Sequence, residues 1–331
     1  MTNSSSKELA SGVDYKAIRE ELLAMMDNPS HDDGSIGPIL IRLAWHSSGT
    51  YDKESKSGGS SGAGMRLDKS SEALDPENKG LEVARAFLDP IKKKYPGISY
   101  SDLWILAAYT AIEHTEGPHI EFQPGRQDVE KPDLAAPAGR LPQAEFGCNG
   151  EVDDKGRMVG WEKLANHIRS VFNRMGFSDG EIVALMCGGH VYGRCHSNYS
   201  GYEGVWVEEP TKFSNEYAAD MVEDEWICVT HDTLVNGKPV DDRVRPAKGK
   251  RQYVSKNVGS HADNMEGTPQ MMLAADMVLL WDDEFKVHLQ KYAEDVTLLK
   301  KDFGAAYKKL TENGVDNLMA CPFGKNNRYI F

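Results

Sequence analysis

The chain has 331 residues, 40% of them hydrophobic and 27% charged, which is typical of a folded globular protein and excludes wholesale disorder. Acidic residues outnumber basic ones by 51 to 38, for a net charge of −13, which argues against binding to nucleic acid or an anionic membrane and suits a basic partner. No apolar run approaches the roughly 18 residues that are needed to cross a bilayer.

The chain begins with MTNSSSKELASGVDYKAIREELLAMM. This stretch has neither the apolar core of a secretory signal nor the Arg-rich, acid-poor character of a transit peptide. We expect residues 1–13 to be flexible, and this stretch taken alone favours a cytoplasmic protein. The five cysteines are an odd number with no CxxC pair, which argues against a disulfide framework or a zinc site and favours a reducing compartment.

Helical periodicity dominates the rest of the chain. Helices are predicted for the stretch beginning at Ile41 and for residues 15–28, 80–95, 99–115, 161–176, 178–190 and 269–295. Between them run long segments rich in Gly, Ser and Pro, and loops of this length are usually functional or wrap a ligand. Residues 234–254 alternate apolar and polar positions around an Asn-Gly pair, which predicts a small hairpin. The pattern indicates an all-α protein with long loops and minor β structure.

One polar trio interrupts an otherwise apolar helix. In IRLAWHSS, Arg42, Trp45 and His46 fall at i, i+3 and i+4 and therefore share one helix face. A guanidinium, an indole N–H and an imidazole on one face suit acid–base work on a small oxygen species. The alternative is a salt-bridged arginine beside a satisfied core histidine.

A second set of segments decides between these interpretations. EIVALMCGGHVYGRCH places His190 just past an apolar helix, SGYEGVW ends at Trp206, and MMLAAD ends at Asp276. Together with RLAWH and with DPENKGL, which contains Asn78, they resemble the motifs of class I haem peroxidases, in the same order, from about residue 14 to about 315. The resemblance implies a haem peroxidase fold of about ten helices in two lobes around one buried haem b.

The resemblance also implies a division of the chain. The haem peroxidase domain would span residues 14–315, with a distal lobe at about 14–140 and a proximal lobe at about 141–315. Residues 316–331 would be a C-terminal tail. Segments 147–160 and 234–252 look like insertions relative to the family. We expect a monomer or a weak dimer.

On the distal side, the resemblance makes His46 the base that takes a proton from peroxide and returns it to the departing oxygen. Asn78 would hold the other ring nitrogen of His46 and so fix its tautomer. Arg42 would assist O–O cleavage and stabilise the ferryl oxygen, while Trp45 would stack over the haem.

On the proximal side, His190 would be the axial ligand of the haem iron. Asp276 would accept its ring N–H, a bond that supports high-valent iron. Arg194, His196 and Ser200 match positions that contact haem propionates in the family.

The electron donor depends on other positions. In cytochrome c peroxidases the counterpart of Trp206 becomes a radical and receives electrons from ferrocytochrome c. Val191 and Val207 replace threonines that bind potassium in ascorbate peroxidases, and Tyr199 replaces the arginine that binds ascorbate. The paired methionines before LAAD also look like cytochrome c peroxidase, because polarizable sulfur could ease a cation on the indole.

We therefore expect an enzyme that reduces hydrogen peroxide with ferrocytochrome c. Tyr199, Glu208 and Glu209 are candidates for the electron-entry or substrate region. An ascorbate or hybrid-specificity peroxidase is the alternative within this class, and a haem-based peroxide sensor is the non-enzyme alternative. The inferred donor favours the mitochondrial intermembrane space instead, so the expected location is either the cytoplasm or that space.

Overall fold

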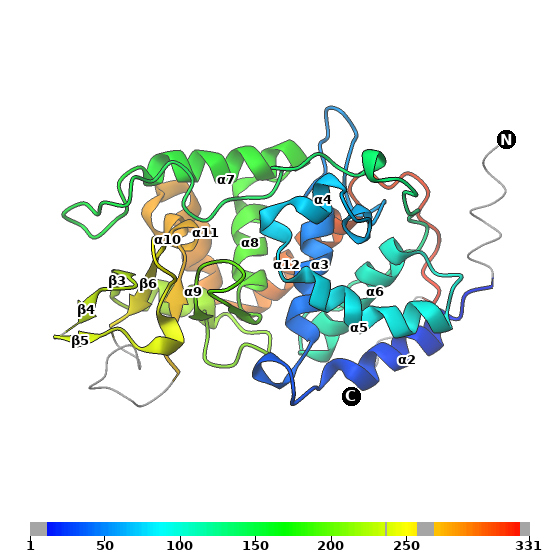
Figure 1. Ribbon diagram of the computed structural model, residues 1–331, viewed down its shortest axis with the longest axis horizontal. Helices are drawn as coiled ribbons and strands as arrows, with labels where there is room; N and C mark the ends of the chain where they lie inside the picture. The colour runs from blue at the N-terminus through cyan, green and yellow to red at the C-terminus, as the bar shows by residue number, and fades with distance from the viewer. Residues whose placement is uncertain (1–11, 236, 257–267, 325–331) are drawn as a thin grey trace. The chain divides into compact units, whose positions relative to one another are not determined.

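The computed structural model describes residues 12–235, 237–256 and 268–324 (Figure 1). Most of the expected flexible segment 1–13, Asn236 of the expected hairpin and the end of the expected tail 316–331 lie outside these residues. Within the described ranges the chain forms eleven α-helices and little strand, which confirms the predicted all-α fold. None of these helices is long and apolar enough to cross a membrane.

The described residues divide into two compact units. The first comprises residues 12–141, Arg174–Gly176 and 304–324, and the second comprises Pro142–Asn173 and Phe177–Phe303. Residues 304–315, which the sequence pattern assigned to the second lobe, group with the first unit. The reason is visible in their contacts, since the Tyr307 hydroxyl donates to the carbonyl of Ile41.

The first unit is built from helices of the N-terminal part of the chain and the end of α12. Its α-helices are α2 (Tyr15–Met26), α3 (Gly37–Ser48), α4 (Ser71–Leu74), α5 (Leu81–Lys94) and α6 (Tyr100–His114), with α12 (Val296–Glu312) entering from Gly304. Short 3-10 turns lie at Asp32–Gly34, Gly64–Arg66, Pro76–Asn78 and Pro132–Leu134.

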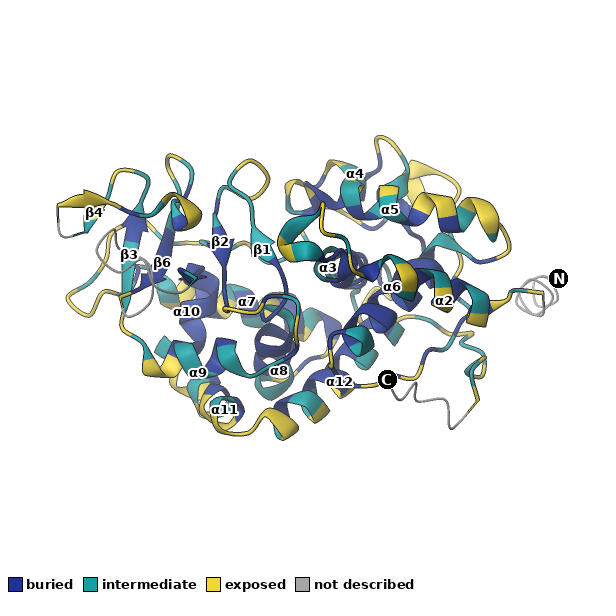
Figure 2. Cartoon of the chain, turned by 90° about the horizontal axis from the view of Figure 1, so that it is seen from below, coloured by how far each residue is buried: buried dark blue, intermediate teal, exposed yellow. Residues whose placement is uncertain are grey.

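Helix α6 forms the centre of this unit. Every residue from Ser101 to Ile112 is buried, so the helix is enclosed on all sides (Figure 2). The helix begins as predicted, because the Ser99 hydroxyl accepts a hydrogen bond from the Asp102 amide. Helices α2, α3 and α5 pack against it, and this rigid support holds α3, which carries the polar trio.

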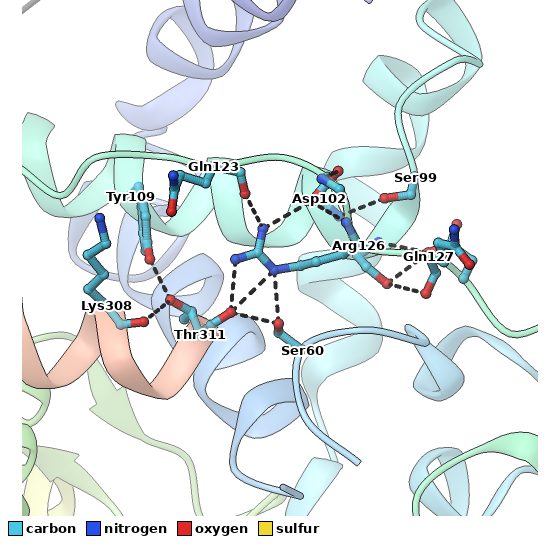
Figure 3. A network of polar contacts seen from close by, with 12 residues as sticks. Ser60, Ser99, Asp102, Tyr109, Gln123, Arg126, Gln127, Lys308 and Thr311 are labelled. Carbon is cyan, nitrogen blue, oxygen red and sulfur yellow. Dashed lines mark hydrogen bonds and ion pairs between the residues drawn. The ribbon is translucent and has the colours of Figure 1, made fainter. Parts of the chain in front are cut away.

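A buried charged network ties distant parts of the first unit together (Figure 3). The guanidinium of Arg126 donates to Asp102 at 3.0 Å, to Ser60 at 2.9 Å and to the carbonyl of Thr311 at 2.8 Å. The Arg126 side chain is fully buried, and the pairing offsets the cost of removing its charge from water.

The second unit contains the remaining helices and all the strands. Its α-helices are α7 (Trp161–Met175), α8 (Asp179–Gly189), α9 (Glu216–Glu223), α10 (Ala274–Trp281), α11 (Asp283–Glu294) and the first part of α12. Its strands are β1 (Arg194–Cys195), β2 (Gly204–Val205), β3 (Trp226–Thr230), β4 (Leu234–Val235), β5 (Lys238–Pro239), β6 (Arg251–Ser255) and β7 (Met271–Met272), and a 3-10 turn lies at Asp242–Val244.

The structure differs from the periodicity at residues 269–295. The sequence predicts one helix there, but Met271–Met272 form strand β7, which pairs with β6, and helix α10 begins only at Ala274. The helix then breaks at Asp282, because that side chain accepts hydrogen bonds from the amides of Glu284 and Phe285 and so caps a new helix, α11.

The predicted hairpin forms as a pair of two-residue strands, β4 and β5, joined around Gly237. Beyond it, β3, β6 and β7 make a three-stranded antiparallel sheet, so the chain has more strand than the sequence indicates. All five cysteines are free thiols in the structure.

Candidate active site

The polar trio lies on the less buried face of α3. Leu40, Leu43 and Ala44 are fully buried, whereas Arg42, Trp45 and His46 are half-buried. The helix therefore packs its apolar side into the first unit and presents the trio together, as the i, i+3, i+4 spacing predicts.

His46 is held in one tautomer by an amide whose orientation is itself fixed. The Nδ1 atom of His46 lies 2.9 Å from the Asn78 Oδ1 atom, and the Asn78 Nδ2 atom donates to the carbonyl of Glu72 at 2.8 Å. Because that carbonyl can only accept, the amide nitrogen of Asn78 must face it and the amide oxygen must face His46. The His46 Nδ1 atom therefore carries the proton, and its Nε2 atom is left as a base.

Arg42 is anchored to the same segment as Asn78. Its guanidinium donates to the carbonyl of Glu77 at 2.9 Å and to that of Lys79 at 3.3 Å. One short loop thus positions both the cation and the partner of the imidazole. The Trp45 and His46 rings meet edge to face with centroids 6.2 Å apart. The role of the Glu72 carbonyl could not be predicted from the sequence, because a contact through the backbone does not depend on the residue type.

Glu72 also makes stability depend on pH. Burial raises the pKa of its carboxyl to about 7, opposed by a hydrogen bond from the Ala136 amide and by Arg66. Between an unfolded value near 4.5 and 7, only the native state holds the proton, so stability falls by about 3 kcal/mol as pH rises through this window.

Urea unfolding at pH 5 and pH 8 tests this assignment. In the wild type the free energy of unfolding should be lower at pH 8 than at pH 5, and Glu72→Gln should remove the part of that difference that Glu72 causes. The exposed-site control Glu82→Gln should keep the wild-type profile, and an unchanged profile in Glu72→Gln would contradict the assignment.

In the second unit, Asp276 gathers the predicted proximal residues. Helix α8 ends at Gly189, and His190 follows as its C-cap. The Asp276 Oδ1 atom lies 2.7 Å from His190 Nδ1, and its Oδ2 atom accepts from Trp206 Nε1 at 2.8 Å. The imidazole and indole rings stack with centroids 4.4 Å apart and planes 17° from parallel.

Two further donors complete the shell of Asp276. The Leu273 amide donates to Oδ2 at 2.7 Å, and the Tyr217 hydroxyl donates to Oδ1 at 2.9 Å. Burial favours the neutral acid, but the charge and hydrogen bond of His190, together with the Leu273 and Trp206 donors, outweigh it and lower the pKa of Asp276. Tyr217 is a site residue that the sequence missed.

The chemistry of His190 fits an axial ligand. Because its Nδ1 atom is engaged by a carboxylate, its Nε2 atom is the one that would bind a metal, and such a bond makes the imidazole more basic. The side chain of His190 is 33% exposed, whereas Asp276 behind it is fully buried. The described residues therefore suit a haem whose iron is bound at Nε2.

The other predicted haem contacts lie on one segment of the second unit. Strands β1 and β2 pair Arg194 with Val205, and the turn between them carries His196, Tyr199 and Ser200. The Ser200 hydroxyl lies within hydrogen-bonding distance of the His196 carbonyl, at 3.2 Å, and also accepts from the Tyr202 amide.

Tyr199 is 37% exposed and meets the His196 ring edge to face, at 6.0 Å. The insertion 234–252 is fastened to this turn by a bond from the Ala247 amide to the Gly201 carbonyl. Glu208 and Glu209 are exposed just after Trp206, and the Glu208 amide donates to the Glu216 carboxylate at 2.5 Å.

Comparison with known proteins agrees with this geometry. Residues 18–295 match the peroxidase family model. The chain is 43% identical, over 91% of its length and 82% of the relative's, to a protein of Aspergillus fumigatus named as a candidate heme-binding peroxidase. It is 42% identical, over 96% of its length and 75% of the relative's, to the mitochondrial cytochrome c peroxidase of Pyricularia oryzae. The mitochondrial cytochrome c peroxidase of Neurospora crassa is 40% identical, over 96% of this chain and 75% of the relative's length. The chain therefore belongs to the peroxidase family, as a class I haem peroxidase that uses haem as its cofactor.

Proposed function

We propose that this enzyme reduces hydrogen peroxide with electrons from ferrocytochrome c, and that Trp206 is the residue through which those electrons pass. The observation that carries the proposal is the placement of Trp206, stacked on His190 and hydrogen-bonded to Asp276. An indole in contact with the histidine that would hold the haem iron, and beside a buried carboxylate, is well placed to lose an electron, because the negative charge stabilises the resulting cation.

In this proposal His190 holds the haem through Nε2, and Asp276 keeps its ring oriented. Arg194 and His196 bind the propionates, to which a guanidinium is well suited. Ser200 is less suited to bind a propionate, since its hydroxyl already has two backbone partners. Bound haem supplies the iron at which peroxide is reduced.

The residues of the α3 face handle the protons and the charge of the peroxide. His46 takes a proton at Nε2 and returns it to the departing oxygen, since its Nδ1–H is committed to Asn78. Arg42, fixed by two backbone carbonyls, stabilises the negative charge that develops as the O–O bond breaks. Trp45 would donate its indole N–H to the other peroxide oxygen, the one that does not depart.

Four features favour Trp206 as the oxidised residue or cytochrome c as its electron donor. Val191 and Val207 are fully buried and have no side-chain oxygen, so neither side chain can bind a cation that would oppose the indole cation. The charge of −13 favours the approach of a basic partner, and Glu208 and Glu209 are exposed beside Trp206 in the sequence. Relatives named mitochondrial cytochrome c peroxidases support the same donor and a location in the mitochondrial intermembrane space.

Trp206→Phe tests this function. After one equivalent of peroxide, electron paramagnetic resonance should show a tryptophan radical in the wild type and none in Trp206→Phe. Oxidation of ferrocytochrome c should fall roughly 10²-fold, equivalent to about 2.7 kcal/mol of activation free energy. Trp226→Phe, a tryptophan of the same unit, should behave as the wild type. A porphyrin-only radical that persists with unchanged turnover in Trp206→Phe would overturn the proposal.

Ascorbate is a second candidate donor, favoured by one observation. The insertion 234–252 places the Lys250 ammonium 5.1 Å from the centroid of the Tyr202 ring, on the turn that carries Tyr199. This lysine brings a positive charge to the turn that also carries Tyr199, which takes the place of the ascorbate-binding arginine of ascorbate peroxidases. Lys250→Met should lower turnover with ascorbate and spare turnover with ferrocytochrome c if this second function is present.

A further inference from the structure

The proposed function uses Asp276 to orient His190, and it leaves the hydroxyl of Tyr217 without a role. This hydroxyl donates to Asp276 Oδ1 at 2.9 Å, and His190 Nδ1 lies 2.7 Å from the same oxygen atom. The side chains of Tyr217 and Asp276 are both fully buried, so water does not compete for this bond. Two donors therefore share one carboxylate oxygen, and one of them belongs to the histidine that would hold the haem iron.

The carboxylate of Asp276 is fully occupied by hydrogen-bond donors. Each carboxylate oxygen has about two lone pairs that can accept, and Oδ1 uses them for His190 and Tyr217. The Oδ2 atom accepts from the Trp206 indole at 2.8 Å and from the Leu273 amide at 2.7 Å. Each donor withdraws negative charge from the carboxylate, and the Tyr217 hydroxyl does so at the oxygen that binds His190.

The position of Tyr217 is fixed by the helix that carries it. Tyr217 is the second residue of α9, and the side chain of Asn215, the N-cap residue, donates to the carbonyl of Ala293 at 2.6 Å and to that of Tyr292 at 3.2 Å. The Tyr217 ring also meets the His190 ring nearly edge to face, with centroids 5.9 Å apart and planes at 74°. The hydroxyl is therefore held at the carboxylate from two directions.

The Tyr217 hydroxyl can act only as a donor to the carboxylate. Burial and the nearby charge of Asp276 raise the pKa of Tyr217 well above its ordinary value, so the phenol keeps its proton. A hydrogen bond to an ionised acceptor is about twice as strong as one between neutral groups. The bond therefore lowers the basicity of Asp276, and a less basic carboxylate attracts the Nδ1 proton of His190 less strongly.

We propose that Tyr217 is a positioning residue that tunes the bound iron through Asp276, by weakening the attraction of this carboxylate for the Nδ1 proton of His190. A less basic axial imidazole stabilises ferric iron less, so the hydroxyl sets the reduction potential of the iron higher than it would be without Tyr217. Asp276 and Tyr217 then act in opposite directions on one ligand. The inference rests on the part of the proposed function in which His190 binds the iron, and it does not depend on the electron donor.

Tyr217→Phe tests this role, because it removes the hydroxyl and keeps the ring. In the haem-loaded enzyme, the ratio of ferrous to ferric iron at a fixed electrode potential should fall roughly threefold to tenfold, the equivalent of one hydrogen bond and of a shift of about 30–60 mV to lower potential. The iron–histidine stretching band of the ferrous enzyme in resonance Raman spectra should move to higher frequency, because the imidazole becomes a stronger ligand.

The matched control is Tyr292→Phe. Tyr292 is a buried tyrosine of the same unit, and its hydroxyl donates to the carboxylate of Asp302 at 3.1 Å rather than to Asp276. This variant therefore also removes a buried hydroxyl from a carboxylate, but from one that has no bond to His190. Its reduction potential and its stretching band should both match those of the wild type.

A fluorinated tyrosine moves both readouts in the other direction. The hydroxyl of fluorotyrosine is more acidic than that of tyrosine and is therefore a stronger donor. Tyr217→fluorotyrosine should raise the reduction potential and lower the frequency of the stretching band. A side chain that only fills space would produce no such reversal. This second variant also keeps the test valid if Tyr217→Phe folds poorly.

The outcomes separate the role of Tyr217 from the proposed function. An unchanged or higher potential in Tyr217→Phe, together with a raised potential in Asp276→Ala, would overturn the role of Tyr217 alone. A wild-type potential in Tyr217→fluorotyrosine would do the same. An unchanged potential in both Tyr217→Phe and Asp276→Ala would mean that His190 is not the axial ligand, and this result would overturn the proposed function together with the inference.

Discussion

His46→Leu is expected to lower the rate of reaction with hydrogen peroxide by about 10²–10⁴-fold, the usual contribution of a positioned general acid–base group. The reason is the fixed tautomer, because Asn78 holds the Nδ1 proton and leaves Nε2 to accept and return the proton of peroxide. The measurement is the stopped-flow rate of the haem absorption change at increasing peroxide concentration.

The control for this prediction is His114→Leu, a histidine of the same unit at the end of α6, paired with Asp27. It should react at the wild-type rate, and both variants should bind haem normally by absorption. Asn78→Ala should react with peroxide more slowly than the wild type but faster than His46→Leu. The imidazole of His46 is still present in this variant, but the hydrogen bond that fixes its tautomer is lost. Near-normal peroxide cleavage in His46→Leu would refute the role of this residue.

Asp276→Ala is expected to destabilise the protein by about 3–5 kcal/mol, because it leaves several buried donors without their acceptor, each at a cost of about 1–3 kcal/mol. Four donors converge on this fully buried carboxylate, and the substitution removes the acceptor of all four. The measurement is the shift in the urea midpoint of the haem-loaded enzyme. The reduction potential of the iron should also rise, because His190 loses the bond that makes it more basic.

Tyr217→Phe is the matched comparison, since it removes one neutral donor and keeps the ring that packs against His190. It should cost no more than about 1.5 kcal/mol. If Asp276→Ala and Tyr217→Phe had equal effects on stability, the carboxylate would not be the centre of the proximal group.

Local patterns predicted the parts of the fold that depend on neighbours in sequence. The face shared by Arg42, Trp45 and His46 followed from helical spacing alone, and so did the helix predicted over residues 99–115, which the structure has at Tyr100–His114. These features involve residues within four positions of each other, so the periodicity contains the whole of the information.

Contacts between distant segments could not be found in this way. Tyr217 reaches Asp276 from a short helix that the periodicity did not reveal, and the Glu72 carbonyl orients Asn78 through the backbone. The break at Asp282 was missed because apolar spacing continues across it, while the cap that causes it is a polar contact. The grouping of His190, Trp206 and Asp276 came from resemblance to a family rather than from spacing.

The buried network around Arg126 has a consequence for how the chain is made. Its hydrogen bond to Thr311 joins residues 185 positions apart, and the bond from Ser60 to Thr311 joins residues 251 apart. A ribosome must therefore release nearly the whole chain before the first unit can complete its core. The second unit ends at Phe303, only a few residues before Thr311, so the N-terminal segments of the first unit cannot complete their fold well ahead of the second. Until Thr311 emerges, the guanidinium of Arg126 lacks one of its acceptors.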